Sequence, residues 1–253
     1  MWWIGALLIG LSLGLFGSGG SIVTVPVLIY LVGQEDKVAI AGSLFIVGAV
    51  AGLGAISFMR KGLIHWRSVL WFGVPGIAGT VGGAWAAAFV SGRFQLIVFS
   101  LVMLGAAVGM LRGGSTMASA ELKPPRTRWK IIADGLIVGG LTGFVGVGGG
   151  FLIIPALVLL GGLTPVLAVG TSLFIISIKS FAGFAKYLSV LGSLGLAVDW
   201  QVLGLFTLLG GAASLVGGAL SRRMPERLFR KAFAIALVVV GVFILLNASG
   251  VLR

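Results

Sequence analysis

The sequence predicts an all-α polytopic membrane protein, and three observations carry this prediction. Hydrophobic residues make up 58% of the 253 residues and charged residues only 9%, whereas soluble domains carry about 25% charged residues. The mean hydropathy is +1.18. Apolar stretches long enough to cross a bilayer as helices, which takes about 20 residues, follow one another along the whole chain.

Eight hydrophobic segments are expected, and two of them are unusually long. The long ones are the first and the fifth, 2–33 and 131–162, and each is interrupted by glycines. The connector 112–130 contains a Pro-Pro pair and scattered charges, so it is expected to be a polar cytoplasmic linker. It separates a first transmembrane repeat, 1–111, from a second, 131–253. The remaining segments are 38–59, 66–90, 94–111, 166–188, 198–220 and 229–249.

The two halves are related in sequence at a fixed offset of 129 residues. The stretch 14–45, which begins GLFGSGGSIVTVP, aligns without gaps with 143–174, which begins GFVGVGGGFLIIP, and twelve of the 32 positions are identical. The identities include four ordered glycines, the prolines at 26 and 155, and two copies of Ser-Leu-Phe. Chance matching of apolar residues does not produce that set, so an internal duplication is expected.

Basic residues predict how the halves lie in the membrane. If all eight segments cross once, ten basic residues fall on one face and seven on the other. If the first and fifth segments turn back at their glycines, the loops 60–67, 112–130 and 222–231 share one face, with thirteen basic residues against four. The positive-inside rule favours this second arrangement. The first and fifth segments are therefore expected to be broken or re-entrant, and the halves to form an inverted repeat.

The glycine interruptions suggest an anion site. Backbone that leaves a helix inside a membrane must be buried in protein or line a cavity. Glycine permits such turns, and a half-helix that follows the turn directs free N–H groups at it. Close helix packing through small residues is the alternative. The expected substrate-binding groups belong to Gly17, Ser18, Gly19, Gly20, Ser21, Gly146, Gly148, Gly149 and Gly150.

A second repeated element carries small hydroxyl residues, AGSLF at 41–45 and GTSLF at 170–174. Ser43, Thr171 and Ser172 either cap helix starts or donate hydrogen bonds to a substrate in the same cavity.

Lys179 lies within the segment 166–188, nine residues from its end, or about 13 Å along a helix. A charge at that depth costs at least about 2.5–3.5 kcal/mol. No acidic residue lies in the centre of any segment, so the lysine suits a negatively charged substrate. Snorkelling of its long stem to the membrane surface is the alternative. The aligned residue in the first half is Val50, so the charge is not repeated.

These motifs resemble the sulfite exporter TauE/SafE family of membrane anion permeases. The resemblance rests on GxGGxxxxxP, then Gly33 or Gly162, then Ser-Leu-Phe, in both halves, and it covers essentially the whole chain. It implies movement of sulfite, organosulfonates or related sulfur oxyanions across the cytoplasmic membrane. Ser18 and Ser21 align with Val147 and Gly150, so an asymmetric site is expected.

The resulting hypothesis is a secondary transporter of small anions that works by alternating access. An anion channel, or a non-transporting membrane subunit of a larger complex, is the alternative. The chain has no cysteine and one histidine, His65, which leaves no thiolate chemistry and no metal cluster. We expect no catalytic residue, cofactor, metal or nucleic-acid partner. The expected partners are the anion and the lipid bilayer, and a homo-oligomer is compatible with the sequence.

Overall fold

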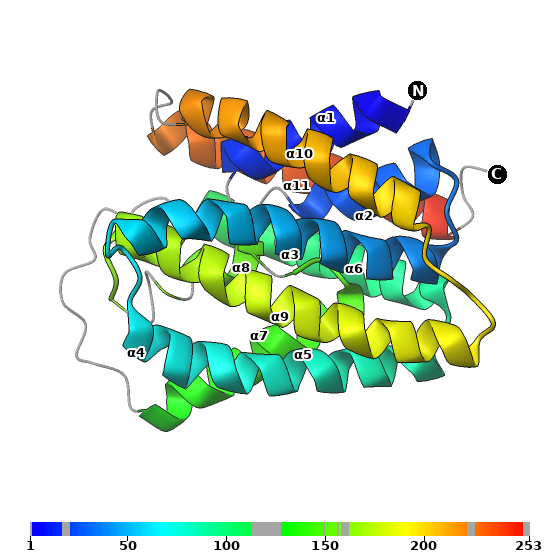
Figure 1. Ribbon diagram of the computed structural model, residues 1–253, viewed down its shortest axis with the longest axis horizontal. Helices are drawn as coiled ribbons and strands as arrows, with labels where there is room; N and C mark the ends of the chain where they lie inside the picture. Colours follow the sequence, from blue (N-terminus) through cyan, green and yellow to red (C-terminus); the bar gives the residue numbers. More distant parts are fainter. Residues whose placement is uncertain are drawn as a thin grey trace.

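Every element of the described chain is a helix in the computed structural model (Figure 1). The structure describes residues 2–16, 21–112, 128–148, 150–155, 157, 162–221 and 226–249. In that part of the chain, six helices are long and apolar enough to cross a membrane, so this is a multi-pass membrane protein. They are Asp36–Arg60, Trp66–Phe89, Gly92–Gly109, Val166–Ser193, Trp200–Gly217 and Lys231–Ser249.

Each of the six predicted segments of ordinary length corresponds to one of these helices. Five are single α-helices: α3 (Asp36–Arg60), α6 (Gly92–Arg112), α9 (Pro165–Ser193), α10 (Trp200–Ser221) and α11 (Glu226–Ser249). The sixth is composite, made of α4 (Trp66–Ser68), a π-helical turn (Val69–Gly73), α5 (Val74–Ala86) and a 3-10 turn (Ala87–Phe89). Pro75 follows the π-helical turn and has no N–H for the carbonyl four residues earlier, which agrees with a wider turn at this point.

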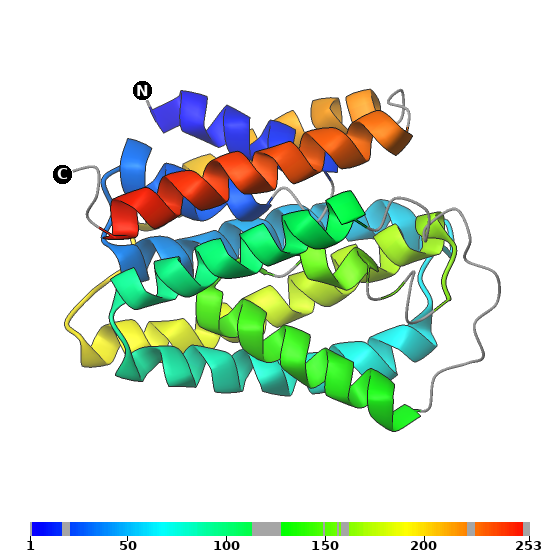
Figure 2. The same cartoon turned by 180° about the vertical axis from the view of Figure 1, so that it is seen from behind.

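The first and fifth predicted segments contain shorter helices instead of one spanning helix. The first holds α1 (Trp2–Phe16) and α2 (Thr24–Pro26), which continues into a π-helical turn (Val27–Leu31). The fifth holds α7 (Arg128–Val145) and the six-residue α8 (Gly150–Pro155). Figures 1 and 2 show α7 ending in the interior of the molecule and α8 leading back toward the end where α7 begins. Six long helices and two sets of shorter ones thus stand where eight segments are expected.

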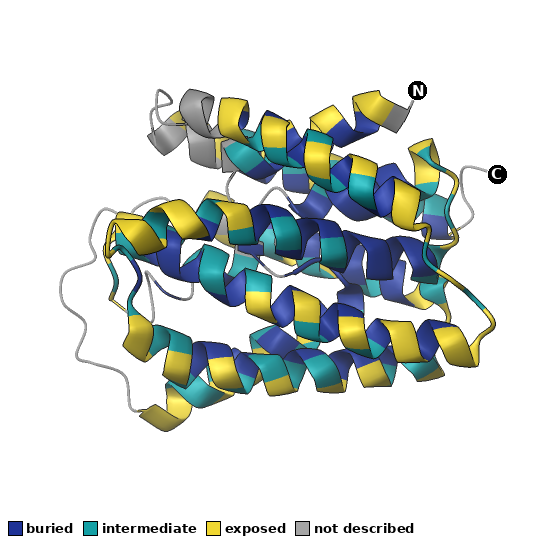
Figure 3. Cartoon of the chain, viewed as in Figure 1, coloured by how far each residue is buried: buried dark blue, intermediate teal, exposed yellow. Residues whose placement is uncertain are grey.

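The helices pack in four pairs, and one of these pairs lies at the centre. α3 packs along α9 in the middle, α1 packs along α10, α5 along α7, and α6 along α11. The spanning part of α3 is 67% buried and that of α9 is 50% buried, against 28–33% for the other four spans. Figure 3 shows the buried surface of α3 in dark blue. The core of the protein therefore lies along the contact between α3 and α9.

Glycines bring α5 and α7 into unusually close contact. A Cβ added at Gly83 would lie 2.1 Å from the carbonyl oxygen of Gly140, and one added at Gly143 would lie 2.1 Å from that of Thr80. Atoms at those distances overlap, so no residue with a side chain fits without moving a helix. These glycines have the packing role that small residues have in membrane helix pairs.

Candidate functional site

The chain turns sharply after α7, in the middle of the protein. Gly146 has φ +78° and Gly148 has φ +65°, values in the left-handed region that residues with a Cβ rarely adopt. The N–H groups of Gly146 and Val147 donate to the carbonyl of Thr142 at 2.9 and 3.4 Å. These two glycines therefore allow the helix to end here and the backbone to turn.

One face of α3 holds this turn. The Ser43 hydroxyl donates a hydrogen bond to the Gly146 carbonyl. A Cβ added at Gly146 would overlap Ile40, and one added at Gly148 would lie 2.8 Å from Cγ1 of Val47. Ile40, Ser43 and Val47 follow helical spacing, so they lie on the same side of α3. Ser43 thus stabilises the turn through its hydrogen bond to Gly146. It does not cap its own helix, because α3 begins at Asp36.

α9 closes the other side of the turn. An added Cβ at Gly148 would lie 2.9 Å from the Ser180 Oγ and 3.4 Å from Cγ2 of Ile176. The Ser180 hydroxyl is buried and has no hydrogen-bond partner in the described part of the chain. The turn at 146–148 therefore lies between α3 and α9, next to the Ser180 hydroxyl, which could donate a hydrogen bond to a ligand.

Lys179 is the neighbour of Ser180 and lies at the midpoint of α9, 14 residues from both Pro165 and Ser193. That is about 21 Å of helix on each side, deeper than the sequence suggests. Its side chain is 1% exposed, so it does not snorkel to the surface. The stem lies against α5, where a Cβ added at Gly76 would be 3.2 Å from the lysine Cδ. Among the described residues, no group forms a hydrogen bond with the lysine Nζ.

A buried polar network anchors the last turn of α7. The Gln95 amide donates to the Phe144 carbonyl and, at 2.7 Å, to the Tyr187 hydroxyl. The tyrosine in turn donates to the same carbonyl at 3.0 Å. The last carbonyls of a helix lack partners within the helix, and here side chains from α6 and α9 supply one.

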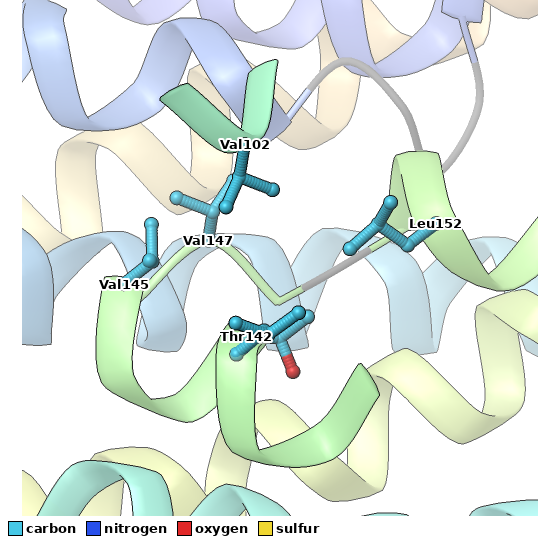
Figure 4. Close-up of a pocket in the computed structure, with 6 residues that line it drawn as sticks. Val102, Thr142, Val145, Val147 and Leu152 are labelled. Carbon is cyan, nitrogen blue, oxygen red and sulfur yellow. The ribbon is translucent and has the colours of Figure 1, made fainter. Parts of the chain in front are cut away.

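A small apolar pocket lies on the side of the turn that faces α6 (Figure 4). The Thr142 hydroxyl is bonded to the Gly139 carbonyl at 3.0 Å, so the pocket presents mainly methyl groups. It is lined by Val102, Leu141, Thr142, Val145, Val147 and Leu152.

In the first glycine interruption, the structure describes only the residues that follow the glycines, from Ser21 onward. Gly17, Ser18, Gly19 and Gly20, and Gly149 of the second interruption, lie outside the described residues. Ser21 and Thr24 are fully buried, and the Thr24 hydroxyl has no hydrogen-bond partner in the described part of the chain. Gly150 is buried and begins α8.

Two of the predicted hydroxyl residues, Thr171 and Ser172, form hydrogen bonds with protein groups away from the turn. The Thr171 Oγ1 accepts a hydrogen bond of 2.9 Å from the His65 N–H, beside the connection between α3 and α4. The Ser172 hydroxyl donates to the Val169 carbonyl of its own helix at 2.9 Å. Neither is a helix cap, because α9 begins at Pro165. The structure thus brings Ser43 and Ser180 to the turn at Gly146 and Gly148. It places Lys179 against Gly76 of α5 and gives Thr171 and Ser172 structural contacts elsewhere.

Three residues of this region escape sequence reasoning: Gln95, Ser180 and Tyr187. Gln95 carries the signal that could have found it, because it is the one amide side chain in an otherwise apolar segment, 94–111. Polar groups inside membrane helices usually face other protein groups. Ser180 and Tyr187 are ordinary in sequence and become notable only through their contacts.

Six membrane-length helices in the described part of the chain define a multi-pass membrane protein. The family model described as sulfite exporter TauE/SafE matches residues 2–244, and the chain belongs to this family of membrane transporters. A probable membrane transporter protein of Xylella fastidiosa is 31% identical, over 94% of this chain and 91% of its own length. Another, YunE of Bacillus subtilis, is 28% identical over 93% of both chains. No solved structure matches the chain.

Proposed function

We propose that the protein is a secondary transporter of small anions, namely sulfite, organosulfonates or related sulfur oxyanions, in the cytoplasmic membrane. The observation that carries the proposal is the Lys179 side-chain nitrogen, which is buried at the middle of α9 and has no hydrogen-bond partner among the described residues. A buried charge is retained when something pairs with it. In a transporter, the substrate anion is the natural partner.

The surroundings of Lys179 suit a small oxyanion. The Ser180 hydroxyl lies on the same turn of α9, beside Gly148, and supplies a hydrogen-bond donor that is unpaired among the described residues. Gly148 has no side chain, so an anion can approach the backbone of the turn closely. Anionic oxygens accept hydrogen bonds from O–H and ammonium donors, and charge-assisted hydrogen bonds are about twice as strong as neutral ones. The site proposed here comprises Lys179, Ser180 and the turn that Ser43 holds.

The pairing of helices supports an inverted repeat and alternating access. The first segment of each half packs along the third segment of the other half, as α1·α10 and α7·α5. The second segments pair with each other, as do the fourth, in α3·α9 and α6·α11. A two-fold relation between halves produces this exchange, and transporters of that plan move one unit against the other around a central site.

Single cysteines will test whether the fifth segment turns back. The natural chain has no cysteine, so each introduced thiol reports alone. Lys130→Cys and Thr164→Cys, both at exposed positions, should react with an impermeant maleimide from the same face of the membrane. Glu35→Cys and Ser91→Cys, also exposed, should react from the opposite face. Labelling of positions 130 and 164 from opposite faces would mean that the fifth segment crosses the bilayer.

Transport itself is tested with the purified protein in liposomes. Labelled sulfite, methanesulfonate and thiosulfate are supplied outside, and uptake is compared with protein-free liposomes. Saturable uptake of at least one of these anions is the expected result. If none accumulates, in either direction of the gradient, the proposed function is wrong.

A further inference from the structure

Lys179 is a single charge in an otherwise uncharged centre. No Asp, Glu, Arg, Lys or His occurs within 38–59, 69–89, 94–111 or 135–178. These stretches include the parts of α3, α5, α7 and α8 that pack against α9. The charged residues on those helices lie toward the helix ends: Asp36, Lys37 and Arg60 on α3, and Arg128, Lys130 and Asp134 on α7. On α9 itself, the other charged residue is Lys186.

From this charge balance we infer that the site selects monovalent over divalent anions, an inference that rests on the proposed function. One ammonium and one monoanion form a neutral complex. One ammonium and one dianion leave a net negative charge in the membrane interior, where no second cation compensates it. The substrate class is therefore monovalent sulfur oxyanions, such as hydrogen sulfite and alkylsulfonates.

The other groups around the turn do not replace a second cation. The Ser180 hydroxyl and the backbone N–H groups are neutral dipoles, while Val47 and Ile176 line the turn with methyl groups. Neutral donors lower the free energy of an excess charge but do not cancel it. Because these donors offset part of the cost, a dianion should have a kcat/KM about 10- to 100-fold below that of a monoanion of the same size.

Methanesulfonate and sulfate make the direct comparison, because a methyl group replaces one charged oxygen at nearly constant size. Initial uptake rates of both are measured in proteoliposomes containing the intact protein, over a range of concentrations. We expect methanesulfonate to have the higher kcat/KM by at least about tenfold. Equal values for the two anions would overturn the inference while leaving an anion transporter in place. If methanesulfonate, sulfate and sulfite are all not taken up, the proposed function itself is contradicted.

Sulfite supplies a second measurement with one molecule in two charge states, because hydrogen sulfite loses its proton near neutral pH. Sulfite uptake at a fixed total concentration should rise several-fold from slightly alkaline to slightly acidic buffer, after subtraction of uptake into protein-free liposomes. Methanesulfonate stays monovalent throughout and controls for effects of pH on the protein. A ratio of sulfite to methanesulfonate uptake that does not change with pH would contradict monoanion selection.

Discussion

Lys179→Met is expected to lower anion uptake by about 30-fold or more while the protein remains folded. The substitution removes the one charge that faces the proposed substrate, and loss of a partner from a buried charge pair costs about 2–5 kcal/mol of binding. Methionine fills most of the volume of the lysine stem that lies against Gly76. Since the ammonium has no described partner, its removal leaves no group unpaired. Uptake and thermal unfolding are measured on the same preparation.

Lys186→Met is the matched control for this experiment. Lys186 is on the same helix, seven residues toward its end and only half-buried, so its replacement should leave uptake near the wild-type rate. Lys179→Arg keeps the charge in a larger group and should retain measurable uptake, with a changed KM. Wild-type uptake by Lys179→Met would show that the anion does not bind at Lys179 and would contradict the proposed site.

The spanning helices are predictable from sequence because the bilayer imposes their length. The segment 38–59 corresponds to Asp36–Arg60, and 198–220 to Trp200–Ser221. The largest error is at the end of α9, which continues to Ser193 where the sequence suggests 188. Lys186 looks like the polar end of a segment, but its long apolar stem allows the charge to reach water from within a helix. That error also made Lys179 look shallower than it is.

The contacts of the site could not be predicted, because they join residues far apart in the chain. Ser43 and Gly146 are separated by 103 residues, and Gln95 and Tyr187 by 92. A repeat comparison aligns equivalent positions in the two halves but does not say what each position touches. Glycine itself is ambiguous in sequence: Gly146 and Gly148 form a turn with positive φ, whereas Gly143, in the same run, lies in α7 and packs against Thr80.

Gly143→Ala is expected to destabilise the protein by about 3 kcal/mol, more than most single substitutions. The new Cβ would lie 2.1 Å from the Thr80 carbonyl oxygen and 2.7 Å from the Thr80 carbonyl carbon and Cα. All three are backbone atoms, so no side chain can rotate away and α5 must separate from α7. The midpoint of thermal unfolding in detergent should fall by several degrees.

Gly82→Ala provides the control, since it makes the same chemical change on α5 at a position where an added Cβ meets no atom within 4 Å. Alanine is the better helix former by about 0.8–1.0 kcal/mol in water, so this variant should be as stable as the wild type or slightly more stable. Gly143→Ala should also reduce uptake, because Gly143 is three residues from Gly146 and a displaced α7 carries the turn away from Ser43 and Ser180. Equal stability of the two alanine variants would mean that α5 and α7 are not in close contact, and that the turn is held by α3 and α9 alone.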